Sequence, residues 1–276
     1  IQWSQEIITF IKNYHQEHKK WIDGFAKHPS NHLSLVHKET GALELYDGRL
    51  RSVDPTGKEL LNIADVEYGY HFKEAVEPWS YLKFPYMSEY GRKKGWNRVG
   101  PLARLNTCSH ISTPLAEAER KLFKSYTKNK PNNMTMHTHW ARLIEMLHCA
   151  ELMKELLLDD DIMGNDLERK GTKRNKGIGI IEAPRGTLIH EYHTDDKGLI
   201  TKCNLIVSTT HNNEAMNRSV RTVAKKVLDD QLEITEPMLN QIEIAIRAYD
   251  PCLSCATHAL GEMPLIVRLE NHEGYL

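Results

Sequence analysis

The stretch Asp250-Pro251-Cys252-Leu253-Ser254-Cys255-Ala256-Thr257-His258 holds the densest group of reactive side chains in this sequence. Two cysteines separated by two residues can turn both sulfurs toward one point. Thiolates are soft ligands that suit zinc, iron–sulfur, copper(I) and nickel–iron chemistry, and the histidine three residues later can approach the same region. The motif alone leaves open a thiol redox pair, half of a zinc site, or another thiolate-bound metal centre.

The composition of the whole chain narrows the classes of protein to consider. Its 276 residues suit one large domain or two modest ones, and 40% apolar and 26% charged residues are ordinary for a globular protein. A net charge of -1 argues against a nucleic-acid partner. The sequence contains no apolar run as long as roughly 18 residues, so we expect no transmembrane helix. The cysteines are too few and too scattered for a disulfide scaffold, so we expect a cytoplasmic protein.

Upstream of the cysteine motif, the apolar spacing predicts helices and one β unit. A helix opens at Thr235 and ends at Asp250-Pro251, and another helix carries Met216 to Val227. Residues 178–208 predict a short strand running into Glu182-Ala183-Pro184-Arg185-Gly186, followed by a hairpin around residues 195–198.

The first half of the chain predicts a helix, a small β region and two further helices. The N-terminal helix carries Trp3, Ile7, Phe10, Ile11 and Tyr14, with Ser4 and Gln5 in an exposed first turn. Hairpin turns follow at Asp47-Gly48 and Asp54–Gly57, residues 63–112 read as irregular, and helices are predicted at 114–128 and 138–158. Residues 159–176 read as a charged, solvated connection. The fold class is therefore mainly α with small antiparallel β units, an α+β fold.

The cysteine motif resembles the end of the large subunit of [NiFe]-hydrogenases, and other blocks of that family occur in the same order. The blocks that carry the resemblance are Tyr46–Arg51, Gly100–Leu105, Glu182–Gly186 and Val207–Asn212, with Ser208 where the family usually has proline. Residues 187–190 and 255–261 look most like the cytoplasmic bidirectional, NAD(P)-linked group. The resemblance implies a fold like that of hydrogenase large subunits.

The resemblance also implies a metal centre for which this chain has half the ligands. In the family, two C-x-x-C pairs hold nickel, and one cysteine of each pair bridges to an iron that carries CO and cyanide. Cys252 then looks like the terminal nickel ligand and Cys255 like the bridging one. The first pair has no counterpart, because Cys108, Cys149 and Cys203 stand alone and fit structural, buried thiols.

Three further residues gain roles from the resemblance. Pro184 and Arg185 lie in the turn that approaches the metal centre, and a guanidinium there can hydrogen-bond a cyanide. Thr209 can donate to the other cyanide, and Asp250 forms part of the polar cover beside Arg185. Read without the family, Arg185 pairs with Glu182, Thr209 is a strand-end hydroxyl and Asp250 ends a helix. Cys252, or a basic group near Arg185, would accept the proton when hydrogen is split.

The resemblance implies that residues 1–258 are the C-terminal part of the large subunit, inactive alone, and that residues 259–276 are a precursor extension. In the family an endopeptidase removes such a tail after nickel insertion, here by cutting after His258, which then helps to hold magnesium or a similar ion. The alternating Leu265, Val267 and Leu269 equally fit an ordinary strand.

The implied partners are a small subunit with Fe–S clusters, diaphorase subunits that reach NAD(P), the maturation endopeptidase and nickel-insertion proteins. The alternative function is a stand-alone zinc or thiol-redox module that uses Cys252, Cys255 and His258. His137 and His139 could bind metal, but residues two apart on a helix point apart, so we assign them a structural role.

Overall fold

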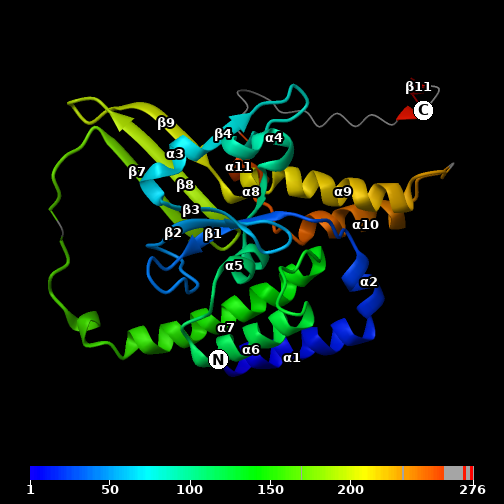
Figure 1. Ribbon diagram of the computed structural model, residues 1–276, viewed down its shortest axis with the longest axis horizontal. Helices are drawn as coiled ribbons and strands as arrows, with labels where there is room; N and C mark the ends of the chain where they lie inside the picture. Colours follow the sequence, from blue (N-terminus) through cyan, green and yellow to red (C-terminus); the bar gives the residue numbers. More distant parts are fainter. Residues whose placement is uncertain (169, 232, 258–269, 272–273, 276) are drawn as a thin grey trace.

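The computed structural model describes residues 1–168, 170–231, 233–257, 270–271 and 274–275 (Figure 1). The α-helices are α1 Gln2–Glu17, α2 Lys19–Gly24, α3 Tyr68–His71, α4 Gly91–Lys94, α5 Pro101–Thr107, α6 Pro114–Tyr126, α7 Thr138–Leu157, α8 Ser208–His211, α9 Asn213–Val227, α10 Glu236–Arg247 and α11 Leu253–Ala256. The strands are β1 Asn31–Val36, β2 Arg49–Val53, β3 Glu59–Ala64, β4 Phe72–Ala75, β5 Phe84–Met87, β6 Asn97–Arg98, β7 Lys176–Ala183, β8 Gly186–Thr194, β9 Ile200–Ile206, β10 Glu270–Asn271 and β11 Gly274–Tyr275. The expected α+β fold is confirmed.

The long helices α1, α6 and α7 lie side by side and form one layer of the molecule (Figure 1). Their shared core continues into α5 and contains the buried side chains of Ile8, Leu102, Phe123, Ile144 and Leu147. Because α5 also packs on β1, this short helix joins the helical layer to the sheets.

Two small sheets form the next layer. One has the strand order β3-β2-β1-β6, and the other is the antiparallel sheet β7-β8-β9. The first is antiparallel except for the short parallel pairing of β6 with β1. Leu33, Leu35, Ile180, Ile189 and Ile206 share one core between the sheets, so β8 is held at a constant position relative to β1.

The helices α9 and α10 pack against each other beside the sheets (Figure 1). Met216 and Val223 of α9 and Ala245 of α10 are buried there. This packing delivers the end of α10, and therefore the cysteine motif, to the edge of the β7-β8-β9 sheet.

The expectation that residues 63–112 are irregular is wrong. They contain the end of β3, then α3, β4, β5, α4, β6 and α5, with 3-10 turns at Asp65–Glu67 and Ser88–Tyr90. All seven residues of α5 are buried, so its sequence has no polar face and no helical periodicity to detect. The short strands find their partners by tertiary pairing, which local sequence does not record.

The N-terminal helix is confirmed, but most of its predicted apolar face is exposed, and Ile11 is the member of that face that packs on the core. Trp3 is 80% exposed and Phe10 66% exposed, whereas Ser4, Ile8 and His15 are the buried residues of α1. The helix therefore turns its less apolar side toward α7.

Two of the three single cysteines also differ from expectation. Cys108 is buried, and burial raises the pKa of its thiol to about 12, which makes it unreactive. Cys149 and Cys203 are exposed. Cys149 lies on the outer side of α7, and the alternation of β9 turns Cys203 away from the core.

His137 joins a polar cluster around Asp23, whereas the Nδ1 atom of His139 lies 3.2 Å from Arg142 Nη1. The Nε2 atoms of His137 and His15 lie 3.1 and 2.9 Å from Asp23 Oδ1, and the carboxylate also accepts from Tyr126 and Lys19. Three atoms that could bind a metal thus lie within 4.8 Å of one another. These hydrogen bonds place the pKa of Asp23 below its usual range.

Asn132 sets the tautomer of His137. Its Oδ1 accepts from Met134 N at 3.0 Å, so its Nδ2 faces His137 Nδ1 at 2.7 Å and donates to it. His137 then carries its proton on Nε2 and donates toward Asp23. The polar groups of the cluster thus have hydrogen-bond partners, and these bonds connect α2 to the start of α7.

None of the helices within the described ranges combines the length and the hydropathy that crossing a membrane requires.

Buried neutral histidines make the fold sensitive to acid. Burial lowers the pKa of His28, His32 and His211 to about 3 and that of His137 to about 4. The unfolded chain takes up these protons near pH 6.5, whereas the folded chain resists until about pH 4 to 3. Stability present at neutral pH is therefore lost as the pH falls through this window.

We predict that His211→Leu weakens this acid sensitivity, because burial alone shifts the pKa of His211. The slope of the free energy of unfolding against pH should fall by up to about 1.4 kcal/mol per pH unit below pH 6.5. Urea denaturation between about pH 8 and pH 4 measures it, with the slope above pH 7 as the internal control. An unchanged slope would contradict a neutral, buried His211.

Candidate metal centre

Both cysteines of the C-x-x-C motif line a cavity of about 340 Å³ between the cysteine loop at α11, the start of α8 and the β7–β8 turn. The lining residues are Ala183, Pro184, Arg185, Leu188, His190, Leu205, Val207, Ser208, Thr209, Cys252 and Cys255. Every predicted site residue that the structure describes lies at this cavity except Asp250, which contacts Arg185 beside it.

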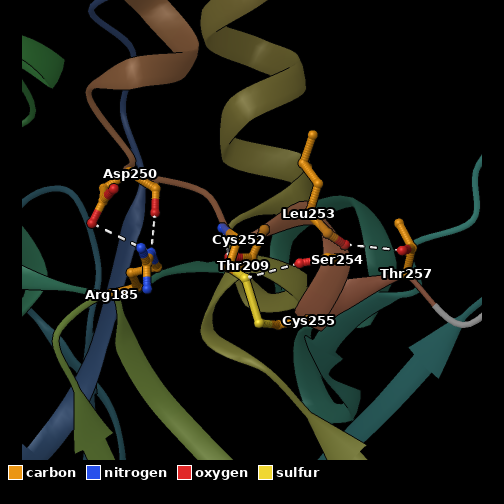
Figure 2. Close-up of a disulfide and its surroundings, with 8 residues drawn as sticks. All are labelled: Arg185, Thr209, Asp250, Cys252, Leu253, Ser254, Cys255 and Thr257. Atoms are coloured by element: carbon orange, nitrogen blue, oxygen red, sulfur yellow. Dashed lines mark hydrogen bonds and ion pairs between the residues drawn. A yellow bond between two sulfur atoms is a disulfide. The ribbon is translucent and has the colours of Figure 1, made fainter.

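The backbone around Asp250 presents the two cysteines. α10 ends at Arg247, Asp250 has a left-handed φ of 50°, and Pro251 prevents the helix from continuing. Cys252 then caps the single-turn helix α11, which brings Cys255 back within a Cα–Cα distance of 5.4 Å. The sulfurs meet in a disulfide, so both side chains point to one place, as the spacing predicts (Figure 2).

Thr209 ties this cysteine loop to α8. The side chain is buried, and its Oγ1 accepts a hydrogen bond from the backbone N of Cys252 at 3.0 Å. A hydroxyl that accepts still has its own proton to donate, so Thr209 can also serve a group inside the cavity. Thr209 lies in the first turn of α8 and not at a strand end.

Arg185 reaches Asp250 across the cavity edge. Its Nε donates to the backbone oxygen of Asp250 at 2.5 Å and lies 3.3 Å from the carboxylate Oδ2 (Figure 2). The alternative pairing of Arg185 with Glu182 is wrong, because Glu182 pairs with Arg104 at 2.8 Å. Arg185 therefore stays at the cavity, where its other N–H groups can bind a ligand.

Sequence reasoning assigned no role to His190, which also lines the cavity. Leu188 and His190 lie two apart on β8, and Leu205 is the register partner of His190 on β9. The period-two alternation of β8 was the signal that places these side chains on one face. His258 and residues 259–269 lie outside the described residues.

The donor set fits a soft metal centre bounded by a cation. Cys252 and Cys255 are the two of the five cysteines that line the cavity, so this chain presents two sulfurs where the family pattern calls for four. Thiolates select soft or borderline metals, and the guanidinium of Arg185 favours anionic ligands beside them. Once the disulfide is reduced, the cavity presents two sulfur ligands beside one cation and one hydroxyl.

Comparisons with known proteins point to one family. A family model described as nickel-dependent hydrogenase matches residues 46–258. The chain is 47% identical to the beta subunit of the NAD-reducing hydrogenase HoxS of Cupriavidus necator, over 100% of this chain and 57% of that protein. It is 42% identical to a component of the F420-non-reducing hydrogenase vhc of Methanococcus voltae, over 89% of this chain and 52% of that protein.

Solved structures give the same answer. The chain resembles the crystal structure of an NAD+-reducing [NiFe]-hydrogenase in the H2-reduced state, with a TM-score of 0.89 and 47% identity. The match covers 93% of this chain and 57% of that one. The chain thus spans a little over half the length of the relatives it matches. With the family model covering most of its residues and the cysteine cavity in place, the chain belongs to the nickel-dependent hydrogenase family.

Proposed function

We propose that this chain forms the C-terminal part of the catalytic subunit of a [NiFe]-hydrogenase that interconverts H2 with protons and electrons and exchanges the electrons with NAD(P). The observation that carries the proposal is the convergence of Cys252, Cys255, Arg185 and Thr209 on one cavity. The similarity to an NAD-reducing hydrogenase supports the choice of electron acceptor.

In this proposal Cys252 and Cys255 would hold the nickel–iron centre through their thiolate sulfurs. The other two thiolates come from a part of the catalytic subunit outside residues 1–276, so the chain is inactive alone. A nickel–iron centre supplies, when bound, a Lewis-acidic and redox-active pair that polarises H2. Cys252 Sγ, or a basic group near Arg185, takes the proton released.

The remaining site residues hold the ligands of the iron. Arg185 is too basic to lose its proton, and Asp250 pins its Nε, so its remaining N–H groups form a fixed donor set. Pro184 precedes it in the turn, adds apolar surface and offers no competing N–H donor. Thr209 donates its hydroxyl proton into the cavity while its oxygen holds the Cys252 backbone.

We expect both motif cysteines to be required for metal binding. With the disulfide reduced, Ni²⁺ added to the chain should give a thiolate-to-metal charge-transfer absorption, which Cys252→Ser and Cys255→Ser each abolish. The exposed Cys203→Ser is the matched control and should leave the absorption unchanged. Binding that survives both motif substitutions would overturn the assignment.

We expect Arg185→Lys in the complete enzyme to lower the turnover rate about a hundredfold, because one ammonium cannot replace a fixed fork of donors. Nickel and iron content should stay at the wild-type level, since Arg185 binds ligands of the metal and not the metal itself. The exposed Arg174→Lys is the control. Wild-type turnover in Arg185→Lys would exclude this role.

We also propose that residues 259–276 are removed after nickel insertion by an endopeptidase that cuts after His258. His258 then helps to hold magnesium or a similar ion. The position of the motif supports this proposal, as does the family match, which ends at residue 258.

Intact-mass measurement of active enzyme tests the processing. We expect a catalytic subunit that ends at His258, and a longer form with Leu276 when the maturation proteins are withheld. Active enzyme that still carries Leu276 would contradict the proposal.

The proposed partners are a small subunit with Fe–S clusters, diaphorase subunits and nickel-insertion proteins, in the cytoplasm, where NAD(P) is available. The second candidate is a zinc or thiol-redox module, which the disulfide at the start of α11 favours. That module has no use for Arg185 or Thr209. Metal analysis of the complete catalytic subunit separates the two: nickel with iron supports the hydrogenase, and stoichiometric zinc supports the module.

A further inference from the structure

The guanidinium of Arg104 is 2% exposed and uses all five of its N–H donors. Nε and Nη2 donate to the two oxygens of Glu145 at 2.7 and 2.6 Å, and Nη1 donates to Glu182 at 2.8 Å. The other two donors reach the backbone oxygens of Ala183 at 2.9 Å and Pro184 at 3.1 Å. One side chain of α5 thus joins α7, the end of β7 and the turn that precedes Arg185.

The two carbonyl contacts are the informative ones. A buried cation needs a carboxylate partner, and Glu145 alone meets that need with a bidentate contact. The donors to Ala183 and Pro184 instead fix the orientation of two successive peptide groups. Because Arg185 follows directly, these contacts set the direction in which its side chain leaves the backbone.

The same turn is held from its other side by the residues that precede α5. Gly100 has a φ of 98°, and a Cβ there would lie 2.9 Å from the backbone oxygen of Arg185. A Cβ at Gly186, where φ is 130°, would lie 2.4 Å from Val99 Cγ2. Ser208 donates to the oxygen of Gly186 at 2.7 Å. The segment 99–104 therefore encloses residues 183–186 with backbone on one side and the Arg104 fork on the other.

We propose that Arg104 is a positioning residue of the candidate metal centre, which orients the 183–185 turn so that Arg185 meets Asp250 at the cavity. The proposal deepens the proposed function and rests on it only for the role of Arg185. It also assigns a role to the Gly100–Leu105 block, which does not itself line the cavity.

A lysine at position 104 keeps the charge but has one nitrogen, so it cannot serve Glu145 and both carbonyls together. In the full-length catalytic subunit of the purified hydrogenase complex, we expect Arg104→Lys to speed amide hydrogen exchange across residues 183–187 at least tenfold. The turnover rate should fall while KM for hydrogen and nickel content stay unchanged, because Arg185 is displaced and not removed.

Leu147→Ala is the matched control, because Leu147 of α7 is as buried as Arg104 but its aliphatic side chain makes no hydrogen bond to the turn. It should lower the thermal midpoint as Arg104→Lys does, without the local change in exchange. If Arg104→Lys does not fold, Glu145→Gln serves instead. The amide NH2 of the new glutamine would face an N–H donor of Arg104, so the guanidinium would have to rotate.

Faster exchange confined to residues 183–187 supports the proposal. Unchanged exchange in Arg104→Lys, or an equal rise in Leu147→Ala, overturns it. Amide exchange can be measured whether or not the protein is an active hydrogenase. If only the proposed function is wrong, the protein will contain no nickel, but Arg104→Lys will still speed exchange in the turn.

Discussion

The buried contact between Arg104 and its two glutamates is the constraint on which the rest of this structure depends. Glu145 belongs to the helical layer, Glu182 to the β7-β8-β9 sheet, and Arg104 to the short helix between them. Buried charges are costly to desolvate, so this triad adds little net stability over an apolar core of the same volume. The triad instead fixes the relative orientation of the three elements, because a planar guanidinium with five occupied donors admits one arrangement of its partners.

Apolar burial assembles the layers that this contact orients. One core joins α1, α5, α6 and α7, and a second joins the two sheets. The site lies at the edge of the second core, where α10 delivers the cysteine loop and β7 turns into β8. The metal-facing side chains thus come from short, irregular segments, while packed helices and strands hold their bases. This division is common in functional sites, since loops accept unusual backbone conformations that helices and strands exclude.

The longer elements and most of the site could be predicted from the sequence. Helices α6, α9 and α10 and the β7-β8-β9 unit follow from periodicity, because each has one more buried and one more solvated face. Helix α7 was predicted in place, but of its expected apolar stripe Trp140 and Leu147 are buried while Met153 and Leu157 are exposed. The region around α5 could not be predicted, because a helix buried on all sides has no periodic signal. The face of α1 was predicted wrongly for a related reason: Ser4 and His15 are buried through tertiary packing and hydrogen bonds and not through hydrophobicity.

The sequence by itself determined the chemistry of this protein: the paired cysteines, the adjacent aspartate and proline, and the arginine in the Glu182–Gly186 turn. Residue type and short spacing suffice for such features, because sulfur softness and backbone geometry are local properties. Only the tertiary structure decided the partners, which include Arg185 with Asp250, Arg104 with Glu182, and His190 facing the cysteine cavity. These pairs lie far apart along the chain, and which charges meet depends on the packing of layers that no local pattern encodes.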